Sequence, residues 1–481
     1  MAKRNLVIIV ADTLREPAPF DRPGAPSMPF LYEMARDATR FDRLFASSSW
    51  TAPSHVSLLT GAPPWETHFH VPGLGPRAPA AVSLADRWRK AGGTAVGFSA
   101  NFLVAPSLGT ATGYTRFNPG FRSGLAGYFQ LAVTFGGYER SLYRAYQRSA
   151  SPHAGGFSRA LEGATRWGGT GVYKSINAMR TTDTLLRPLG KFLAQRAQSA
   201  DRVGTPLHLF MNIAEPHEPY LVGQNGGPAG SRATMGHVPS INLARFNDLL
   251  VDRNDPAPFV DAYRASLEAT DAALRSIVGL LRRRGVLDDA ALLLVSDHGQ
   301  NLGEHGFYGH GCFLHDELVK VPGWLWEFQG GRPVGQTAPP EEWIDHRHLN
   351  DLLAAFTPDG GGVDLHDVLA ASLAQRGPAC SYYEGPGPRP PDGLLVKALR
   401  SEPYRLVRVQ RGNETAQIRS TTKGESIGPW AVGSADSVSA ELAEIGERIL
   451  RYDAMKASAP SGAPGAMDAQ VDARLKSWGY D

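Results

Sequence analysis

Cysteine is scarce in this chain of 481 residues, which contains only Cys312 and Cys380. Two cysteines form at most one bridge, so a disulfide-rich scaffold is excluded and a reducing compartment is compatible with the sequence. No stretch approaches the roughly 20 apolar residues that a membrane-spanning helix needs. The apolar run Leu6–Val10 is too short for a signal core and lacks a cleavage pattern. We therefore expect a cytoplasmic protein with no membrane partner.

A large net charge is also missing. The 49 Lys and Arg residues nearly balance 47 Asp and Glu residues, and the resulting +2 is too small for a dedicated nucleic-acid-binding protein. With 42% hydrophobic and 20% charged residues, the chain can form a sizeable globular core. Its length corresponds to roughly three domains of about 150 residues, which allows one large α/β domain with an appendage.

One region has a local excess of positive charge. Between Glu139 and Arg202 there are eleven Lys and Arg residues against four Asp and Glu residues, and a helical pattern replaces the strand pattern from about 121 to 202. We interpret 121–202 as a helical insertion. Its basic residues form either a solvated helix face or a cap that attracts an anionic substrate.

Short apolar runs elsewhere are typical of strands buried on both faces of a parallel sheet. Amphipathic helical patterns separate these runs, the clearest between Leu267 and Leu281, where Gly285 is expected to end the helix. This alternation predicts an α/β fold with a doubly wound, mixed but mainly parallel sheet flanked by helices. The predicted strands are Leu6–Ala11, Thr94–Ser99, Leu207–Ile213 and Ala290–Ser296.

The C-terminal part differs in composition. Residues 385–391 are rich in glycine and proline and predict a domain boundary, after which Leu394–Leu399 and Tyr404–Val409 resemble strands. We expect a catalytic domain over 1–385 and a small C-terminal α+β module over 386–481, with a flexible Ala/Ser/Pro/Gly-rich segment at about 457–466.

Polar residues follow the predicted strands, at the sheet edge where active sites of such folds gather. Two of these positions carry candidate metal ligands: Asp12 after the first strand, and the pair Asp297 and His298 after the last. Carboxylate and imidazole together suit Mn²⁺, Zn²⁺ or Fe²⁺ better than Ca²⁺. Taken singly, each position is also compatible with an ordinary polar turn.

The segment TAPSHVSLLTG at 51–61 predicts a helix with Thr51 as N-cap, Pro53 in the first turn and Gly61 at the end. A hydroxyl at a helix N-terminus lies near backbone N–H groups that favour an anion such as phosphate. Threonine is a weak nucleophile until a base or a metal activates it, so Thr51 alone is also consistent with a simple cap.

Together these segments resemble the sulfatase and alkaline phosphatase superfamily. The matching features are the first strand NLVIIVADTLR, the nucleophile motif TAPSHVSLLTG, the loop PHEPY at 216–220 and a late SDHG followed by LGEHG, all in the expected order. The match is closest to the phosphonate monoester hydrolase and phosphodiesterase branch and covers about residues 1 to 330, apart from the insertion. The resemblance implies an alkaline phosphatase-like fold.

The resemblance also implies residue roles. A metal ion would be held by Asp12, Asp297, His298 and the nucleophile Thr51, and His217 and His310 would bind substrate or move protons. His310 stands where many relatives have lysine, and His55 replaces the arginine of the sulfatase motif. Substrate contact is assigned to His55, and to Thr13 and Asn101, which follow the ends of two predicted strands.

A threonine at position 51 limits which reaction mechanism the chain can use. Sulfatases use formylglycine made from Cys or Ser, and threonine cannot give this aldehyde because its β-carbon carries a methyl group. We therefore expect no formylglycine and interpret the chain as a metal-dependent phosphoester hydrolase, acting on a phosphodiester or phosphonate monoester through a phosphothreonyl intermediate. Alternatives are a sulfate ester hydrolase without formylglycine, a soluble phosphoryl transferase, and a non-catalytic binding member.

The expected cofactor is one divalent ion, Mn²⁺ or Zn²⁺ before Ca²⁺ or Mg²⁺, because no convincing second ligand set lies between His55 and Asp297. The expected partner is a small anionic ester, with no nucleic acid and no membrane. The sequence leaves oligomeric state open, with a homo-oligomer as one option.

Overall fold

The structure is a computed structural model. It describes residues 4–67, 81–119 except 102, 107 and 108, 182–199, 204–217, 257–338 except 305–307, 311–313 and 315, 340–358, 364–384 except 378, and 394–421 except 402, 403, 412 and 413. The predicted flexible segment 457–466 and most of the predicted insertion 121–202 lie outside these residues.

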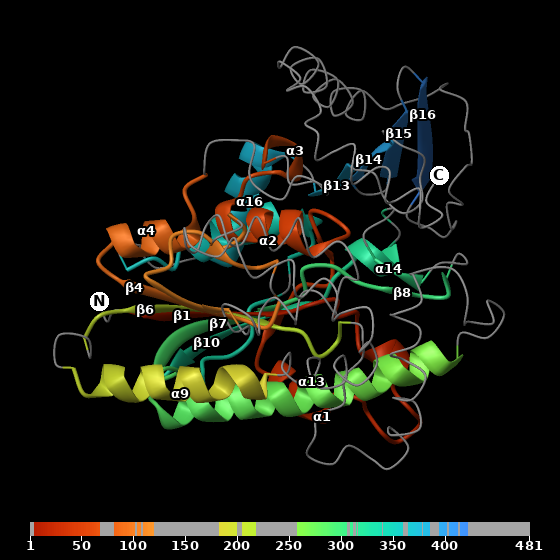
Figure 1. Ribbon diagram of the computed structural model, residues 1–481. Coiled ribbons are helices and arrows are strands. Elements are labelled where there is room, and N and C mark those ends of the chain that lie inside the picture. Colours follow the sequence, from red (N-terminus) through yellow and green to blue (C-terminus); the bar gives the residue numbers. More distant parts are fainter. Residues whose placement is uncertain are drawn as a thin grey trace, which may run out of the picture.

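An eight-stranded sheet forms the centre of the molecule (Figure 1). Its order is β11-β10-β7-β1-β6-β4-β5, with β2 paired to β10. The strands from β7 to β5 run parallel, whereas β10 is antiparallel to β7. The prediction of a mainly parallel, mixed sheet is therefore confirmed. The strands are β1 (Asn5–Ala11), β2 (Thr39–Arg40), β4 (Thr94–Ser99), β5 (Arg116–Pro119), β6 (Leu207–Ile213), β7 (Asp289–Val295), β10 (Gly323–Gln329) and β11 (Arg332–Pro333).

The central strands are apolar on both faces because both faces are covered. In β1, Leu6, Ile8 and Val10 belong to one hydrophobic cluster, and the alternate residues Val7 and Ile9 belong to the other. Side chains on a strand alternate between faces, so a continuous apolar run supplies both clusters. This burial explains why the strand bounds expected from the sequence agree with the structure within one residue.

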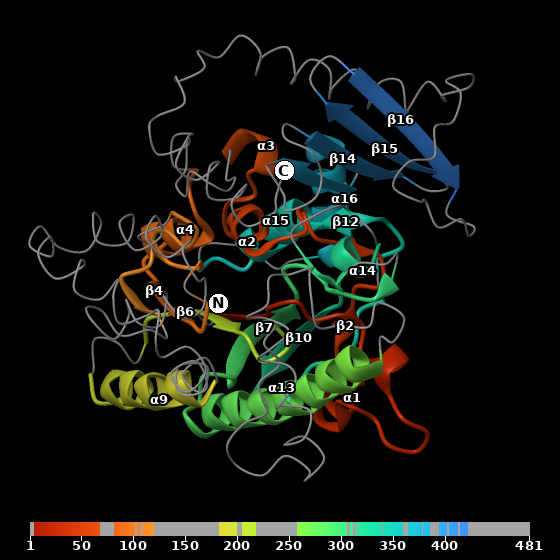
Figure 2. The ribbon, with the colours of Figure 1, turned by 45° about the vertical axis from the view of Figure 1, so that its right-hand side comes forward.

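Helices form a layer on each side of the sheet (Figures 1 and 2). The amphipathic pattern at 267–281 lies in α13, whose apolar residues pack into the same cluster as those of α9. The helix ends at Arg283 and Gly285 follows with φ of 67°, as predicted. One layer contains α1 (Pro29–Ala35), α9 (Asp183–Ala197) and α13 (Ala257–Arg283), and the other contains α2 (Thr51–Thr60), α4 (Leu84–Lys90), α15 (His346–Ala354) and α16 (Leu365–Arg376).

A second, four-stranded antiparallel sheet lies beside the α2 and α16 layer (Figure 2). It consists of β13 (Ala379–Glu384), β14 (Leu394–Ser401), β15 (Tyr404–Arg411) and β16 (Glu414–Thr421). The two strands expected in the C-terminal module are β14 and β15. Because β13 pairs with β14, this sheet contains residues on both sides of the boundary expected after 385.

Short elements complete the described part of the chain. They are the 3₁₀ helix η1 (Ala18–Phe20), β3 (Leu44–Phe45), α3 (Pro64–Thr67), β8 (Asn301–Leu302), β9 (Tyr308–Gly309), α14 (Asp316–Val319) and β12 (Ile344–Asp345). Among the described residues, no helix combines the length and the apolar character that a membrane crossing requires.

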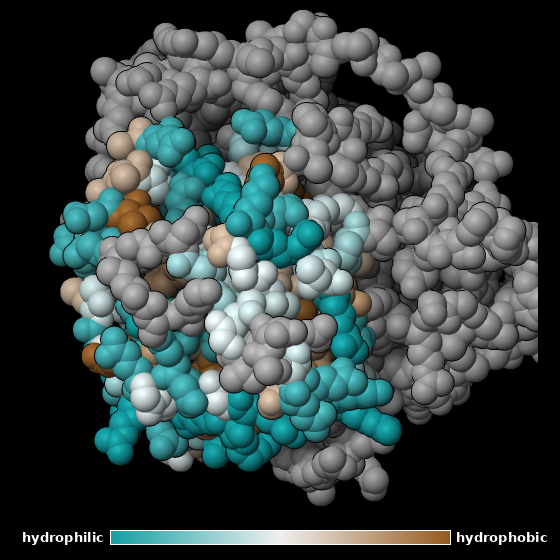
Figure 3. All heavy atoms as spheres, turned by 90° about the vertical axis from the view of Figure 1, so that its left-hand side faces the viewer, coloured by the Kyte–Doolittle hydropathy of each residue, from teal (hydrophilic) through white to brown (hydrophobic). Residues whose placement is uncertain are grey.

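The side of the molecule on the left of Figure 1, where the labels of α4 and β6 stand, is largely hydrophilic over its described residues (Figure 3). A cavity of about 720 Å³ lies between α4, the beginnings of β4 and β5, and α9. Its charged lining residues are Asp86, Arg89, Lys90 and Arg116. Thr94 at the start of β4 lines it, so it lies away from the carboxyl ends of the strands.

Candidate active site

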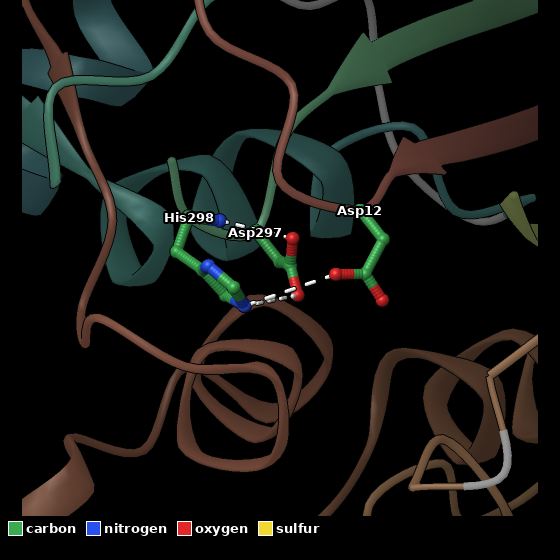
Figure 4. A group of neighbouring side chains, drawn as sticks. All are labelled: Asp12, Asp297 and His298. Carbon is green, nitrogen blue, oxygen red and sulfur yellow. Dashed lines mark hydrogen bonds and ion pairs between the residues drawn. The ribbon is translucent and has the colours of Figure 1, made fainter. Parts of the chain in front are cut away.

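Three buried side chains meet at the carboxyl ends of β1 and β7: Asp12, Asp297 and His298 (Figure 4). One ligand atom from each lies within 4.8 Å of the others. Because β1 and β7 are adjacent and parallel, the residues that follow them emerge at the same edge of the sheet. We call these three residues the carboxylate–histidine cluster.

The donor atoms of this cluster fit a divalent cation. Nδ1 of His298 lies 2.9 Å from the carbonyl oxygen of Gly299, which can only accept, so Nδ1 carries the proton and Nε2 presents a lone pair. That lone pair faces Asp297 Oδ2 at 3.4 Å and Asp12 Oδ1 at 3.8 Å. Among the described residues, Oδ1 of Asp12 accepts no hydrogen bond. Three electron-rich atoms without a proton between them are a ligand set for a metal ion.

Thr51 adds an oxygen to this ligand set. It is the first residue of α2, fully within the protein at 1% exposure, and its Oγ1 lies 3.3 Å from Nε2 of His298. The prediction that Thr51 is the N-cap is wrong, because Trp50 occupies that position and no side chain caps the helix. The hydroxyl is directed at the cluster instead. Gly61 ends the helix with φ of 72°, as predicted.

The loop after β7 is held against the segment that contains α14. The N–H of Gly299 donates to Leu318 O at 2.7 Å, and the N–H of Gln300 donates to Glu317 O at 3.0 Å. A side chain at 299 would collide with the Glu317 carbonyl, so only glycine allows this close approach. The glycine of the Asp-His-Gly motif therefore fixes the direction in which its two predecessors point.

Thr13 is placed as a structural support of the cluster. It has φ of 60°, a left-handed conformation that costs a non-glycine residue about 1–2 kcal/mol. Its N–H donates to Asp297 Oδ1 at 3.2 Å, and its hydroxyl donates to Pro216 O at 2.8 Å. Tyr263 donates to its carbonyl oxygen at 2.9 Å. The Thr13 hydroxyl therefore donates to a backbone oxygen of the protein. The sequence had predicted that it contacts substrate.

His55 also lies against protein groups around the cluster. It is wholly buried, with Nδ1 2.9 Å from Thr51 O and 3.3 Å from Asp297 Oδ2, and with Nε2 3.2 Å from Asn212 Nδ2. Both ring nitrogens therefore face protein groups behind the cluster. No part of its ring is exposed, so the substrate contact expected for His55 stays a prediction.

The side chain of Asn101 likewise contacts a residue of the cluster, the candidate metal ligand Asp12. Its Nδ2 donates to Asp12 Oδ2 at 2.6 Å, and its Oδ1 accepts from the N–H of Leu103 at 2.9 Å. The residue is 7% exposed. Both ends of the amide hold Asp12 and the loop after β4, and the substrate contact expected for Asn101 stays a prediction.

The two expected proton-transfer residues lie next to each other. The ring of His310 is 4.5 Å from the ring of His298 and 4.8 Å from the ring of His217, measured between centroids. Both rings are only half-buried. Nδ1 of His310 donates to the Gln300 side-chain oxygen at 2.8 Å. The three histidines therefore form a row that leads outward from the cluster.

The charges of the site shift its pKa values. Burial alone would raise the pKa of Asp297, but the neighbouring His298 and His55 outweigh burial and lower it. Burial lowers the pKa of His298 despite the nearby carboxylates, which favours the neutral ring that a metal ligand requires. Burial also opposes protonation of His55, yet the neighbouring carboxylate of Asp297 raises its pKa.

Sequence reasoning missed two residues of the site. Asn212 lies in β6 between apolar neighbours and contacts His55, and Gln300 orients His310. A lone amide inside the otherwise apolar strand LHLFMNI is a signal that could have singled out Asn212, because a buried polar group needs a partner.

Comparison with known proteins agrees with this fold and site. The family model described as Sulfatase matches residues 4–341, so the chain belongs to the sulfatase family. The resemblance inferred from the motifs is thereby confirmed. Members of this family hydrolyse sulfate or phosphate esters and depend on metal ions, and the prediction of a hydrolase acting on ester bonds is confirmed at this level.

The individual proteins that resemble this chain match it either over a short segment or at low sequence identity. The chain is 39% identical over 70 residues to phosphatidylethanolamine transferase Mcr-2 of Escherichia coli, a match that covers 14% of this chain and 13% of that protein. The phosphonate monoester hydrolase SpPMH from Silicibacter pomeroyi has a similar structure, with a TM-score of 0.56 at 17% identity, covering 93% of this chain and 95% of the other. The phosphonate monoester hydrolase of Agrobacterium radiobacter gives 0.55 at 15%, covering 94% and 96%. These structures share the fold.

Proposed function

We propose that this chain is a metal-dependent phosphoester hydrolase that uses Thr51 as its nucleophile, with a phosphodiester or phosphonate monoester as substrate. The single observation that carries this proposal is the 3.3 Å between Thr51 Oγ1 and His298 Nε2, within the carboxylate–histidine cluster. Threonine cannot become formylglycine, so its own hydroxyl oxygen is the group available to attack.

The metal ion would be held by Asp12, Asp297, His298 and Thr51. When bound, it lowers the pKa of the threonine hydroxyl and offsets negative charge on the ester oxygens. The proposal is one ion, Mn²⁺ or Zn²⁺, because the described ligands combine carboxylate and imidazole. Asp12 Oδ2 is already engaged by Asn101, which leaves Oδ1 as its ligand atom.

In the first step Thr51 Oγ1 gives up its proton to solvent and forms a bond to phosphorus while the bond to the leaving oxygen breaks. His310 or His217 protonates that oxygen, since their half-buried rings lie outward from the cluster. Water then cleaves the phosphothreonine bond, and the product is released with the hydroxyl restored. A single cycle thus consumes one ester and one water.

The proposed substrate carries one negative charge at phosphorus. Histidines 217 and 310 line the outward side of the site, and Arg15, the nearby arginine after β1, is paired with Glu304 at 2.7 Å. The described part of the site therefore offers few permanently charged cations to the substrate. A site with few cations favours a singly charged diester or phosphonate monoester over a doubly charged phosphate monoester.

A substrate panel tests the proposal. Matched aryl phosphodiester, phosphonate monoester, phosphate monoester and sulfate ester substrates are assayed with Mn²⁺, Zn²⁺, Mg²⁺ and Ca²⁺. We expect the first two classes to be hydrolysed fastest with Mn²⁺ or Zn²⁺. Rapid quenching should trap on Thr51 the substituted phosphoryl or phosphonyl group that remains after the leaving alcohol departs, detectable by mass spectrometry. Preferential cleavage of the sulfate ester would replace the proposal with a sulfatase that lacks formylglycine.

A transferase is a second candidate, favoured by the 70-residue match to a phosphatidylethanolamine transferase. In that reaction an alcohol, not water, would take the phosphoryl group from Thr51. Adding an alcohol such as ethanolamine or glycerol to the assay separates the two reactions. A new ester of the alcohol in place of free product would support transfer.

A further inference from the structure

We propose that the amides of Asn101 and Asn212, together with the ring of His55, form a buried relay that positions both carboxylates of the carboxylate–histidine cluster, Asp12 through a hydrogen bond and Asp297 through a charge contact. This inference rests on the proposed metal site, and it assigns Asn212 and His55 as positioning residues. The relay begins at backbone N–H groups in the loop after β4. One branch ends at Asp12, and the other ends at the backbone oxygen of Thr51, where the ring of His55 also lies 3.3 Å from Asp297 Oδ2.

The first branch is short. The N–H of Leu103 donates to Oδ1 of Asn101 at 2.9 Å, and a backbone N–H can only donate. The amide of Asn101 therefore cannot turn over without opposing two donors. Its Nδ2 is thereby directed at Oδ2 of Asp12, at 2.6 Å, and Oδ1 of Asp12 is left facing the cluster.

The second branch begins at the backbone of the same residue. The N–H of Asn101 lies 3.2 Å from Oδ1 of Asn212, which fixes the orientation of this second amide for the same reason. Nδ2 of Asn212 then faces Nε2 of His55 at 3.2 Å. Since Nδ2 can only donate, Nε2 of His55 must accept, and the ring proton lies on Nδ1.

The proton on Nδ1 reaches the cluster. Nδ1 donates to Thr51 O at 2.9 Å and lies 3.3 Å from Asp297 Oδ2, which accepts no hydrogen bond among the described residues. The N–H therefore restrains the backbone of Thr51 by a hydrogen bond and attracts one ligand carboxylate by charge alone. All three relay side chains are buried, with exposures of 7% for Asn101 and 0% for both Asn212 and His55. Without competing water, each hydrogen bond transmits a defined orientation to the next.

A buried amide could instead serve stability alone. A purely structural Asn212 would change the free energy of unfolding when replaced, but it would leave metal affinity and ligand geometry unchanged. A positioning residue changes both, since removing groups that orient ligands typically lowers metal affinity about 10–100-fold. The two roles are therefore separated by measuring metal binding.

The first experiment compares Asn212→Leu with Asn5→Leu. Asn5 lies on the neighbouring strand β1 at the opposite end of the sheet, where its amide also bridges two backbone groups, Val286 O and the N–H of Leu207. Titration with Co²⁺ gives the dissociation constant and the visible spectrum of the bound ion. We expect Asn212→Leu to weaken Co²⁺ binding about tenfold or more and to shift the spectrum. We expect Asn5→Leu to stay within about twofold of wild type.

The second experiment tests the proton position on His55. Asparagine places its amide N–H near Nδ1 of histidine, whereas glutamine places it near Nε2. We expect His55→Asn to keep Co²⁺ affinity within about threefold of wild type and His55→Gln to lose about tenfold. Equal affinities for these two variants, or better binding by His55→Gln, would overturn the relay.

The outcomes separate the relay from the proposed function and from the metal site. Equal Co²⁺ affinity for Asn212→Leu and Asn5→Leu also overturns the relay, and this pair decides the question if the His55 variants do not fold. A wild-type chain that binds Co²⁺ but hydrolyses no ester removes the proposed function and leaves the relay to be judged on affinity. A wild-type chain that binds no Co²⁺ removes the metal site and the relay together.

Discussion

The hydroxyl of Thr51 lies 3.3 Å from Nε2 of His298, although 247 positions separate the two residues in the chain. Thr51 opens a helix on one face of the sheet, and His298 follows a central strand. Their approach places a hydroxyl beside two carboxylates and an imidazole lone pair in a buried site. The chemistry proposed for this chain depends on that approach.

Replacing the Thr51 hydroxyl tests the nucleophile directly. Thr51→Val keeps the shape of the side chain but has no oxygen to attack phosphorus, so we expect turnover to fall by about three orders of magnitude or more. Thr51→Ser retains an oxygen and should retain measurable turnover. Steady-state kinetics on the best substrate of the panel measures both, and near-normal activity of Thr51→Val would refute the assignment.

Metal content provides a second test. We expect one equivalent of divalent metal per chain by elemental analysis, and loss of turnover after chelation with recovery on adding Mn²⁺ or Zn²⁺. His298→Ala removes the Nε2 lone pair that faces both carboxylates, so its metal affinity should fall about 100-fold or more. Two equivalents in the wild-type protein would contradict the single-ion site.

The outer histidines should affect turnover more than metal binding. Because His217 and His310 lie outward from the cluster, we expect His217→Asn and His310→Asn to lower turnover about 100-fold while a metal equivalent remains bound. His366, exposed on α16, supplies the control His366→Asn, which should match wild type. Loss of the metal from either outer variant would instead make these histidines ligands.

Gly299 should be intolerant of a side chain. A β-carbon there meets the Glu317 carbonyl, so Gly299→Ala must displace the loop that carries Asp297 and His298. We expect a loss of about 1–3 kcal/mol in the free energy of unfolding and weaker metal binding, measured by urea denaturation and titration. Gly204, with open space around its β-position, gives the control Gly204→Ala, whose unfolding and metal binding should remain as in wild type.

Acid should destabilise the protein through two buried histidines. Burial lowers the pKa of His208 and of His346 from 6.5 to about 4. Above pH 6.5 both rings are neutral in the folded and unfolded chains. Between pH 6.5 and 4 the unfolded chain takes up protons that the folded chain does not, so stability falls, by about 2 kcal/mol per histidine at pH 5.

His208→Gln tests this pH dependence. Urea denaturation at pH 7 and pH 5 should show that the variant loses about half of the pH-dependent destabilisation contributed by these two residues. The exposed substitution His366→Asn should leave the pH dependence of wild type. An identical slope for wild type and His208→Gln would show that His208 does not titrate as expected.

The sequence predicted the sheet well because its strands depend on local composition. Thr94–Ser99 and Leu207–Ile213 are strands with the bounds expected from their apolar runs, since a strand covered on both faces must be apolar throughout. The ordered motifs also brought Asp12, Thr51, Asp297 and His298 together correctly as neighbours. Residues at the carboxyl ends of parallel strands share one edge, so that proximity follows from topology.

The roles of the supporting residues did not follow from the sequence. His55, Thr13 and Asn101 were expected to contact substrate, but each directs its polar atoms at protein groups around the cluster. Asn212 was not among the predicted site residues, although it is the lone amide in an otherwise apolar strand. Which polar atom faces which partner depends on packing between segments more than 80 residues apart, as the 89-residue separation of Asn101 from Asp12 shows.

The amino-acid order by itself determined the strands, the order of the motifs and the presence at position 51 of a threonine, which cannot become formylglycine, because each depends on residue type and on neighbours in the chain. Only the tertiary structure decided which side chains belong to the cluster and which side chains support it through hydrogen bonds. The physical reason is that a buried polar atom must find its partner among groups that folding alone brings near, and in this protein those groups come from β1, β4, β6, β7 and α2.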